Sequence, residues 1–445
     1  MSRERVVIIG CGFGGLWAVR ELARDATLDI TLIDRTNHHL FQPLLYQVAT
    51  AGLSAPAVSA PVRHILRAEM QRGNLTVLRA AVTDIDAQAR TVTLDDSSTL
   101  PYDHLIVAAG ATHSYFGNDD WARHAPGLKT LADAFNIRQR VIEAFEQAER
   151  RVRDDEHAPW MTFAIIGGGP TGVELAGALA EIARHTLSDE FRHIDSRRAR
   201  VLLLEGADRV LGAFDASLSA KAARSLQQLG VELRTGCKVT GIDADGVTFD
   251  DAATGQSQRI ATRTVLWAAG VAGSPLGRAL QRSAGAQLDR AGRVIVLPDL
   301  TVAAHPEVSV IGDLAAAQST AKDGCTTPVP GVSPAAKQMG HFAARNLQRR
   351  RRGEPMQAFH YADYGSLATI GRSAAVVQLE VPGLGSMRWS GFFAWLFWLF
   401  AHVYFLIGFR NRLIVLIEWA FAYFSFERNA RVVAQPQPND HPAAS

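Results

Sequence analysis

The sequence VVIIGCGFGG, at residues 6–15, places a G-x-G-x-x-G motif directly after a short apolar run. A second copy, FAIIGGGPTG at residues 163–172, repeats this order of features 157 positions further along the chain. Each motif leads into a helical pattern, over residues 16–23 and 173–183. A strand followed by a glycine turn and a helix N-terminus lets backbone N–H groups hold a pyrophosphate. The pair therefore predicts two dinucleotide sites in one chain.

A second repeated feature closes each of these units. The apolar stretch 105–110 ends 100 residues after Gly10, and the stretch 265–270 ends 103 residues after Gly167. Matching spacing at both ends is characteristic of an internal repeat. Strands alternate with longer helical segments as far as about residue 330, as in doubly wound α/β folds. We therefore expect an α/β protein with two Rossmann-like dinucleotide-binding domains.

An acidic residue follows the second strand of each unit. Asp34 comes after the run 30–33, and Glu205 comes after the run 201–204. A carboxylate at this place accepts hydrogen bonds from an adenosine ribose and repels a 2′-phosphate, so Glu205 favours NADH over NADPH. The alternative is a strand-end carboxylate that only caps a loop.

Charge and cysteine content exclude several classes of protein. The net charge is +2, which gives no electrostatic argument for nucleic acid as a partner. The three cysteines, Cys11, Cys237 and Cys325, are far apart and form no C-x-x-C pair. We therefore expect no disulfide framework, no metal site and a reducing compartment. We also expect no signal peptide, because residues 1–5 run straight into the first strand.

The C-terminal region differs in kind from the rest of the chain. Residues 389–409 contain no charged side chain, and as one helix these 21 residues would be ~31 Å long, enough to cross a bilayer. The next apolar stretch, 413–426, follows Asn411 and carries Glu418 and Ser425, which makes one narrow polar stripe at seven-residue spacing. Such an amphipathic pattern is typical of a helix in the membrane interface. We expect amphipathic helices that anchor the chain to a bilayer through residues 388–428, either spanning it or lying in its surface, with a soluble-core helix as the alternative.

Two nucleotide sites and a membrane anchor predict electron transfer from a soluble donor to a lipid-soluble acceptor. NADH gives a hydride, and a flavin is a group that accepts two electrons at once. The first unit, completed by Gly312-Asp313 after the strand-like run 308–311, suits FAD, although Asp313 could instead cap the next helix. The expected domains are an FAD-binding domain over 1–115 and 276–355, an inserted NADH-binding domain over 116–275, and a membrane-anchoring region over 356–445.

The chain resembles the type II NADH:quinone oxidoreductases over residues 5–432. Beyond the glycine motifs, the resemblance rests on NHHLFQPLLYQVA at 37–49, PGV at 330–332, QMG at 338–340, GSLATIGR at 365–372 and GFRNR at 408–412. It implies a single-subunit respiratory flavoprotein that does not pump protons, with non-covalent FAD, NADH as substrate and a membrane quinone as acceptor. It further implies the cytoplasmic face of the bacterial inner membrane, and it leaves a homodimer open.

The motifs and the resemblance together assign the site residues. The FAD contacts are assigned to Gly10, Gly12, Phe13, Gly14, Gly15, Asp34, Arg35, Gln42, Pro43, Leu44, Val82, Ala109, Gly110, Gly312 and Asp313. The NADH contacts are assigned to Gly167, Gly169, Pro170, Thr171, Gly172, Glu205, Ala269 and Gly270. The quinone contacts are assigned to Lys337, Gln338 and Met339. By the resemblance, the loop from Phe41 to Tyr46 lies beside the flavin.

Catalytic roles are expected for Glu174 and Gln338. Glu174 lies two residues after the second motif, so it would point toward the contact between nicotinamide and flavin. The alternative for Glu174 is a carboxylate stabilised by the helix dipole. Pro334 departs from the family pattern, which often has a glutamine there, so the quinone contacts are less defined. His38 and His39 could be proton donors, but loop histidines are more often structural.

Other flavoproteins with two dinucleotide sites fit less well. A disulfide reductase needs a cysteine pair, and residues 16–236 contain no cysteine. A sulfide:quinone oxidoreductase also needs paired cysteines and has no use for Glu205. A ferredoxin- or rubredoxin-type reductase has no use for residues 389–426. A redox sensor that binds NADH and a membrane is the alternative outside the enzymes.

Overall fold

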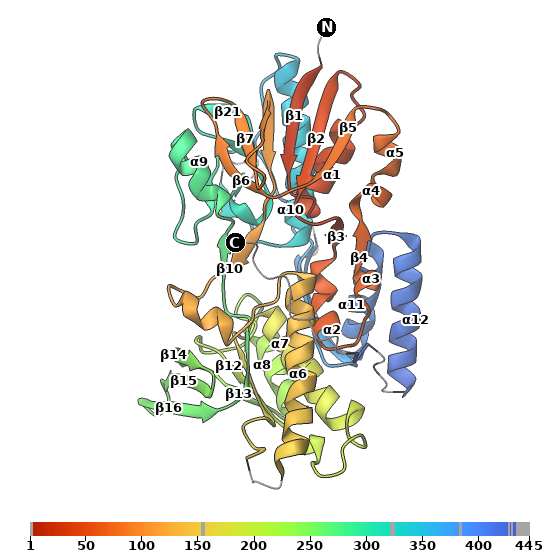
Figure 1. Ribbon diagram of the computed structural model, residues 1–445, viewed down its shortest axis with the longest axis vertical. Helices are drawn as coiled ribbons and strands as arrows, with labels where there is room; N and C mark the ends of the chain where they lie inside the picture. The colour runs from red at the N-terminus through yellow and green to blue at the C-terminus, as the bar shows by residue number, and fades with distance from the viewer. Residues whose placement is uncertain are drawn as a thin grey trace, which may run out of the picture.

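The computed structural model describes residues 3–152, 156–320, 325–381, 385–425, 428 and 430–432. Two α/β halves lie one above the other along the long axis, the first around β1 and β2 and the second around α7 and β12 (Figure 1). Helices α11 and α12 lie at the side of the junction between the halves. The predicted α/β architecture with two Rossmann-like units is confirmed.

The first half is built on a six-stranded sheet with the order β20-β21-β9-β1-β2-β5. Its strands are β1 (Glu4–Ile9), β2 (Leu28–Asp34), β5 (Leu75–Arg79), β9 (His104–Val107), β20 (Thr301–Val302) and β21 (His305–Val310). All of its pairings are parallel except β20 with β21. Its helices are α1 (Phe13–Leu22), α9 (Leu276–Ala284) and α10 (Ser333–Arg351). Strand β21 returns from far along the sequence to pair with β9, so late residues complete the first unit.

Helices α1 and α10 pack unusually closely. A Cβ added at Gly340 on α10 would lie 2.1 Å from the carbonyl oxygen of Gly14 on α1. Only glycine allows this approach, because any side chain would push the helices apart. The contact holds α10 against the helix that starts at the first glycine turn.

The second half has a four-stranded parallel sheet with the order β13-β12-β11-β17. Its strands are β11 (Thr162–Ile166), β12 (Arg200–Leu204), β13 (Val231–Arg234) and β17 (Thr264–Trp267). Its helices are α6 (Leu131–Arg151), α7 (Pro170–Glu181) and α8 (Ala216–Gln228). Strand β11 lies between β12 and β17 just as β1 lies between β2 and β9, which confirms the internal repeat.

Smaller elements complete and connect the halves. Each half carries a three-stranded antiparallel sheet, and the ribbon β10–β18 lies where the chain passes between the halves. These strands are β6 (Val82–Asp86), β7 (Thr91–Leu94), β8 (Thr99–Pro101), β14 (Cys237–Asp243), β15 (Gly246–Asp251), β16 (Gln256–Ala261), β10 (Ala111–His113) and β18 (Val271–Gly273). The short elements near the junction are β3 (His38–Leu40), α2 (Leu45–Ala49), α3 (Ala55–Val58) and β4 (Ser59–Pro61).

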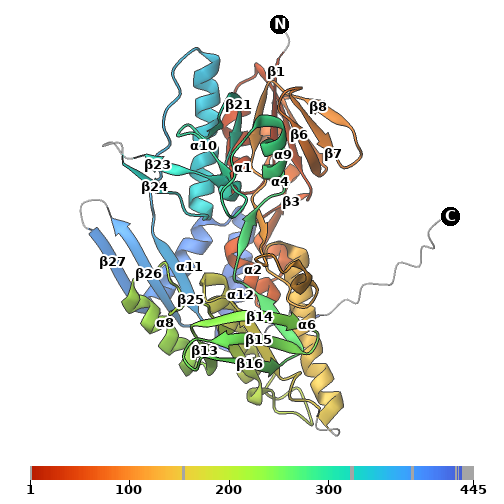
Figure 2. The same cartoon turned by 90° about the vertical axis from the view of Figure 1, so that its left-hand side faces the viewer.

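The C-terminal region consists of a small sheet and two helices. The sheet has the order β25 (Ser366–Ile370), β26 (Ala374–Val381) and β27 (Gly385–Gly391), and it lies between α8 and α11 (Figure 2). The helices are α11 (Phe392–Phe405) and α12 (Phe409–Ser425). Their buried side chains, including Trp398 and Val415, share one hydrophobic core with α2, α6 and α7. The C-terminal helices are therefore part of the wall of the second half.

The continuous helix considered over residues 389–409 does not form. Trp389 pairs with β26 as part of β27, so the helix begins only at Phe392. The helix ends at Phe405, and Gly408 then takes a φ of +89°, while Arg412 donates hydrogen bonds to the carbonyls of Tyr404 and Leu406. Within the described part of the chain, no helix combines the length and apolarity that a membrane crossing requires.

The polar stripe of α12 faces the protein. The Asn411 amide donates to the Ser59 carbonyl at 3.1 Å, and Glu418 accepts from the Ser54 hydroxyl at 3.0 Å. Ser425 instead donates to Phe421 within its own helix. The outer face of both helices is apolar and exposed, at Phe392, Phe393, Leu396, Phe400, Tyr404, Phe405, Phe409, Leu413, Leu416, Ile417, Phe421 and Phe424. The amphipathic pattern is therefore present with Asn411 and Glu418 facing the protein and Ser425 exposed; Phe426, the last residue of the expected stretch, lies outside the described residues.

Candidate functional site

The first glycine turn is braced by Asp34. Asp34 Oδ2 accepts from the Cys11 N–H at 2.6 Å, and its Oδ1 accepts from the N–H and hydroxyl of Thr36. Gly10 has a φ of +94°, and a Cβ there would lie 2.4 Å from the Ala108 carbonyl oxygen. A Cβ added at Gly12, which caps α1, would meet nothing within 4 Å. The turn thus presents an open helix N-terminus that can accept a pyrophosphate.

The second glycine turn repeats this arrangement. Glu205 accepts from the N–H of Gly168, and through Oε1 from the N–H of Ala207 at 2.7 Å. Gly167 has a φ of +106°, and Gly169, which caps α7, again has open space where a Cβ would be. Asp34 and Glu205 therefore occupy equivalent positions. Each carboxylate supports its glycine turn through backbone hydrogen bonds.

The loop around residues 39–44 packs onto the first turn. The ring of Phe13 contacts the rings of His39 and Phe41, with centroids 5.1 Å and 5.8 Å apart. His39 is buried and donates through Nδ1 to the Cys11 carbonyl at 2.8 Å, and its burial lowers its pKa. Its Nε2 has no hydrogen-bond partner among the described residues. These contacts give His39 a structural role and leave one polar atom beside the turn for a ligand.

The other residues predicted for the nucleotides lie mainly at the carboxyl edges of the two sheets. Asp313 lies 3.9 Å from the Lys129 ammonium, and Gln42 donates to the Lys129 carbonyl at 3.0 Å. Gly110 follows β9 and Gly270 follows β17, and both carbonyls accept hydrogen bonds from the connecting chain. Val82 starts β6, and Arg35 is exposed just after β2.

A cleft of about 650 Å³ lies where the two halves meet. Predicted residues from both units line it: Gln42 and Pro43 from the first, and Thr171, Glu174 and Gly270 from the second. Trp267, from the repeated stretch 265–270, also lines it, as do His113 and Lys129, which no motif indicated. The structure thus brings the second glycine turn and the loop that starts at Gln42 to one shared cleft.

Glu174 is buried, with 8% of its surface exposed. Burial raises its pKa to about 8, and the only opposing contribution is a hydrogen bond from the Thr369 N–H at 3.5 Å. A carboxylate stabilised by the helix dipole would show the opposite shift. Glu174 is therefore protonated at neutral pH and can both donate and accept a hydrogen bond.

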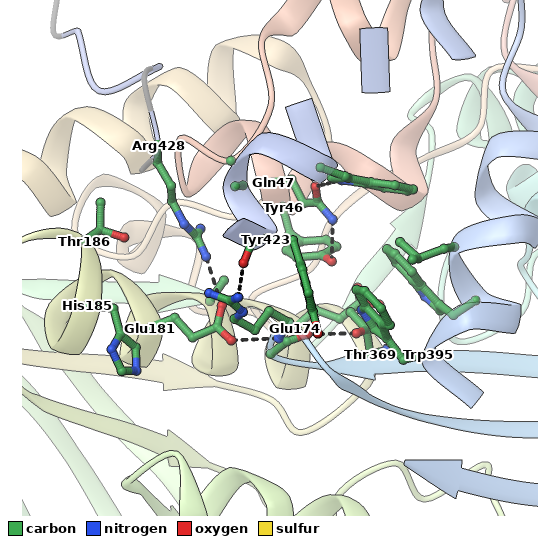
Figure 3. Close-up of a pocket in the computed structure, with 18 residues that line it drawn as sticks. Tyr46, Gln47, Glu174, Glu181, His185, Thr186, Thr369, Trp395, Tyr423 and Arg428 are labelled. Carbon is green, nitrogen blue, oxygen red and sulfur yellow. Dashed lines mark hydrogen bonds and ion pairs between the residues drawn. The ribbon is translucent and has the colours of Figure 1, made fainter. Parts of the chain in front are cut away.

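A second cavity, of about 790 Å³, lies behind Glu174 and is drawn in Figure 3. Trp395, Trp398 and Leu399 from α11 and Trp419 and Tyr423 from α12 form its aromatic side. Its polar side includes Glu174, Glu181, Thr369 and Arg428. Tyr46 and Glu174 line both cavities, so the same two side chains form the wall between them.

A buried ion pair holds the far end of this cavity. Arg428 contacts Glu181 at 3.0 Å and donates to the Thr50 carbonyl at 3.0 Å, and Figure 3 shows the pair side by side. Glu181 also accepts from the Arg372 N–H at 2.7 Å. Burial lowers the pKa of Arg428, and Glu181 opposes that change. The pair fastens the chain after α12 to the end of α7.

Sequence reasoning missed most of the residues that line this cavity. Tyr46 belongs to the loop that was expected beside the flavin, and Gln47 and Arg372 lie inside motifs that carried the family resemblance, but none of the three was assigned to this cavity. Glu181 and Arg428 lie outside every motif, 247 positions apart, and only the fold brings them together.

The residues predicted for the quinone line neither cavity. The Gln338 amide donates to and accepts from the backbone of Ala362, both at 2.9 Å. Met339 is buried beside the Gly312 N–H, and the Lys337 ammonium lies 4.1 Å from the centre of the Trp17 ring. Their contact with a quinone stays a prediction.

Comparison with known proteins covers nearly the whole chain. The sequence model of the pyridine nucleotide-disulphide oxidoreductases matches residues 4–340, and that of the NDH2 C-terminal domain matches residues 364–429. The type II NADH:quinone oxidoreductase Ndh of Mycobacterium tuberculosis is 45% identical over 441 residues, which cover 98% of this chain and 91% of the relative. NdhA of the same organism is 44% identical over 440 residues, covering 97% and 90%.

Solved structures show the same fold. NDH2 from Plasmodium falciparum, solved in complex with NADH, superposes with a TM-score of 0.84 at 19% identity, covering 97% of this chain and 100% of that one. A sulfide:quinone oxidoreductase from Aquifex aeolicus superposes with a TM-score of 0.71 at 18% identity, covering 95% of each chain.

Proposed function

The chain belongs to the type II NADH:quinone oxidoreductases, and from that premise we propose how its two turns and two cavities divide the reaction. It is an enzyme that oxidises NADH and reduces a quinone. The observation that carries the proposal is the shared wall of Tyr46 and Glu174 between the two cavities. Ligands in the two cavities would lie on opposite sides of these two side chains.

The first glycine turn is proposed to hold FAD without a covalent bond. The open space over Gly12, the carboxylate of Asp34 and the unpartnered Nε2 of His39 fit a dinucleotide lying on this turn. Asp313 and Gln42 lie around the same loop and would complete the contacts. The flavin, when bound, supplies the ability to accept two electrons as a hydride and to pass them on.

The second turn is proposed to hold NADH. Glu205 would accept hydrogen bonds from the ribose hydroxyls and repel the 2′-phosphate of NADPH. Thr171 and Gly270 line the cleft and would place the nicotinamide there. Glu174, buried and uncharged, would face the ring and contribute a hydrogen bond without repelling negative charge.

The aromatic cavity is proposed to bind the quinone. Three tryptophans and Tyr423 offer flat apolar surfaces, and Glu174 and Thr369 offer polar atoms, which suits a ring with two carbonyl groups and an isoprenoid tail. The helices that supply these tryptophans carry the exposed apolar face. A lipid-soluble substrate therefore has a short path into the cavity.

The exposed face of α11 and α12 is proposed to anchor the protein in one leaflet. Phe393, Phe409 and Phe424 are each about four-fifths exposed (79%, 81% and 83%), and a contiguous apolar face of this kind marks a surface that contacts a membrane or another protein. The exposed Arg410 lies at the start of α12 next to Phe409 of this face, where it would contact anionic lipid headgroups. We place this face, within residues 388–428, on the cytoplasmic side of the bacterial inner membrane; a homodimer would have to leave it uncovered.

The sulfide:quinone oxidoreductase alternative is not supported. That reaction needs two cysteines near the flavin, whereas Cys11 is buried in the glycine turn, Cys237 starts β14 and Cys325 is exposed elsewhere. The relatives that share 44–45% of the sequence are NADH:quinone oxidoreductases.

A stopped-flow experiment tests the proposed function. NADH should bleach the flavin absorbance of the purified protein in lipid, and a ubiquinone or menaquinone analogue should then restore it. NADPH should bleach it far more slowly. Failure of the quinone to restore the absorbance, when ferricyanide does restore it, would remove the quinone assignment.

A further inference from the structure

Three side chains connect the membrane-facing helix α12 to the wall between the two cavities. The indole N–H of Trp419 on α12 donates to Gln47 Oε1 at 2.6 Å. Gln47 Nε2 donates to the hydroxyl oxygen of Tyr46 at 2.9 Å, and Figure 3 shows this second bond. Gln47 and Tyr46 are neighbours on α2, so the connection is short and fixed.

The direction of donation along this chain of bonds is set by chemistry. An indole N–H can only donate, so the Gln47 amide must present its oxygen to Trp419 and its NH₂ group to Tyr46. The Tyr46 oxygen is then an acceptor in that bond, and the hydroxyl proton must point elsewhere. Among the described residues, the Tyr46 hydroxyl makes no hydrogen bond besides the one it accepts from Gln47.

Tyr46 holds this proton at the boundary of the proposed quinone cavity. Its side chain is 6% exposed and lines both cavities beside Glu174. A buried hydroxyl group without a hydrogen-bond acceptor lowers the stability of a folded protein. A ligand carbonyl in the cavity would supply an acceptor for the Tyr46 hydroxyl. Burial also raises the pKa of Tyr46 well above its usual 10, so the proton stays on the oxygen at neutral pH.

We propose that the Tyr46 hydroxyl donates a hydrogen bond to a quinone carbonyl in the aromatic cavity, and that Gln47 and Trp419 are positioning residues that aim it. This inference rests on the proposed quinone cavity. It also means that the packing of α12 against the rest of the protein affects quinone binding, because Trp419 belongs to the helix that carries the apolar outer face.

A double-mutant cycle with the full-length protein in lipid tests the inference. Tyr46→Phe removes the donor, and we expect kcat/KM for a short-chain ubiquinone analogue to fall about tenfold. Trp419→Phe keeps an aromatic ring but removes the indole N–H that fixes the orientation of the Gln47 amide. We expect kcat/KM for the same quinone to fall about threefold. In the double variant, Trp419→Phe should lower kcat/KM little further than Tyr46→Phe alone, because the Tyr46 hydroxyl that Trp419 positions is already absent.

Gln47→Glu supplies a second, nearly isosteric test. A carboxylate accepts from both Trp419 and Tyr46, so it would turn the Tyr46 proton away from the cavity, and the loss should approach that of Tyr46→Phe. In all three variants the loss with quinone should exceed the loss with ferricyanide as acceptor. Tyr364→Phe, at an exposed tyrosine that lines neither cavity, is the matched control.

Two results would overturn the inference. One is a Tyr46→Phe protein with kcat/KM for the quinone within twofold of wild type. The other is a double variant whose decrease in kcat/KM for the quinone equals the product of the decreases in the two single variants. That result would show that Trp419 acts independently of Tyr46. A wild-type protein whose reduced flavin is not reoxidised by quinone would instead overturn the proposed function itself.

Discussion

At the scale of single residues, Glu174 has the most informative environment. The folded chain keeps a proton on it up to a pH of about 8, whereas an unfolded chain releases it near 4.5. Folding stability should therefore fall as pH rises from 4.5 to 8, by about 1.4 kcal/mol for each pH unit. Glu174→Gln does not titrate, so its melting temperature should exceed that of wild type increasingly over this window. Glu146→Gln, at an exposed site on α6, should show no such difference.

The same substitution tests the role of Glu174 in turnover. Glutamine cannot exchange a proton, so steady-state oxidation of NADH by quinone should be slower while FAD content is kept. Wild-type rates at full flavin loading would show that the carboxyl group serves only packing.

Glu205 carries the prediction about cofactor choice. Replacement by glutamine removes the charge that would repel a 2′-phosphate, so the ratio of kcat/KM for NADPH to that for NADH should rise about tenfold or more. Asp208→Asn, at an exposed residue three positions away, serves as the control. An unchanged ratio would show that Glu205 only accepts hydrogen bonds from the Gly168 and Ala207 N–H groups and does not select the cofactor.

At the scale of elements, the contact between α1 and α10 is decided by glycine. A methyl group at Gly340 would collide with the Gly14 carbonyl, so Gly340→Ala should lower the free energy of unfolding by about 1–3 kcal/mol and weaken FAD retention. Gly212→Ala, where a Cβ would meet nothing within 4 Å, should change neither quantity. Chemical denaturation followed by flavin fluorescence measures both.

The helix pair α11–α12 carries the prediction about the membrane. Phe424 is 83% exposed on the outer face, and replacing it by serine removes a side chain whose burial in lipid is worth about 2 kcal/mol. Sedimentation with anionic vesicles should show binding about tenfold weaker or more. Tyr364→Phe, at an exposed aromatic residue outside α11 and α12, should leave binding as it is.

At the scale of the whole molecule, the Glu181–Arg428 pair links the end of the chain to the second half. Glu181→Gln would leave a buried guanidinium without its counter-charge, so we expect a loss of roughly 3–5 kcal/mol in stability. Glu190→Gln breaks the more exposed pair with Arg431 and should cost roughly 1 kcal/mol or less. Equal losses in thermal denaturation would contradict a special role for the buried pair.

The sequence by itself determined the repeated α/β units, the two nucleotide turns and the class of reaction. These features depend on short local patterns: glycines with φ near +100° at Gly10 and Gly167, apolar strands before them, and carboxylates at the strand ends. Local patterns survive in the fold because backbone conformation is decided within a few residues.

Only the tertiary structure decided how those parts meet. The inward polar side chains of α12 and the aromatic cavity depend on contacts between segments hundreds of positions apart, such as Trp419 with Gln47 and Arg428 with Glu181. The sequence around one partner of such a pair does not indicate the other, because the environment of each is supplied by a distant segment. The dinucleotide sites could thus be read from the sequence, whereas the second cavity and the wall of Tyr46 and Glu174 exist only in the folded chain.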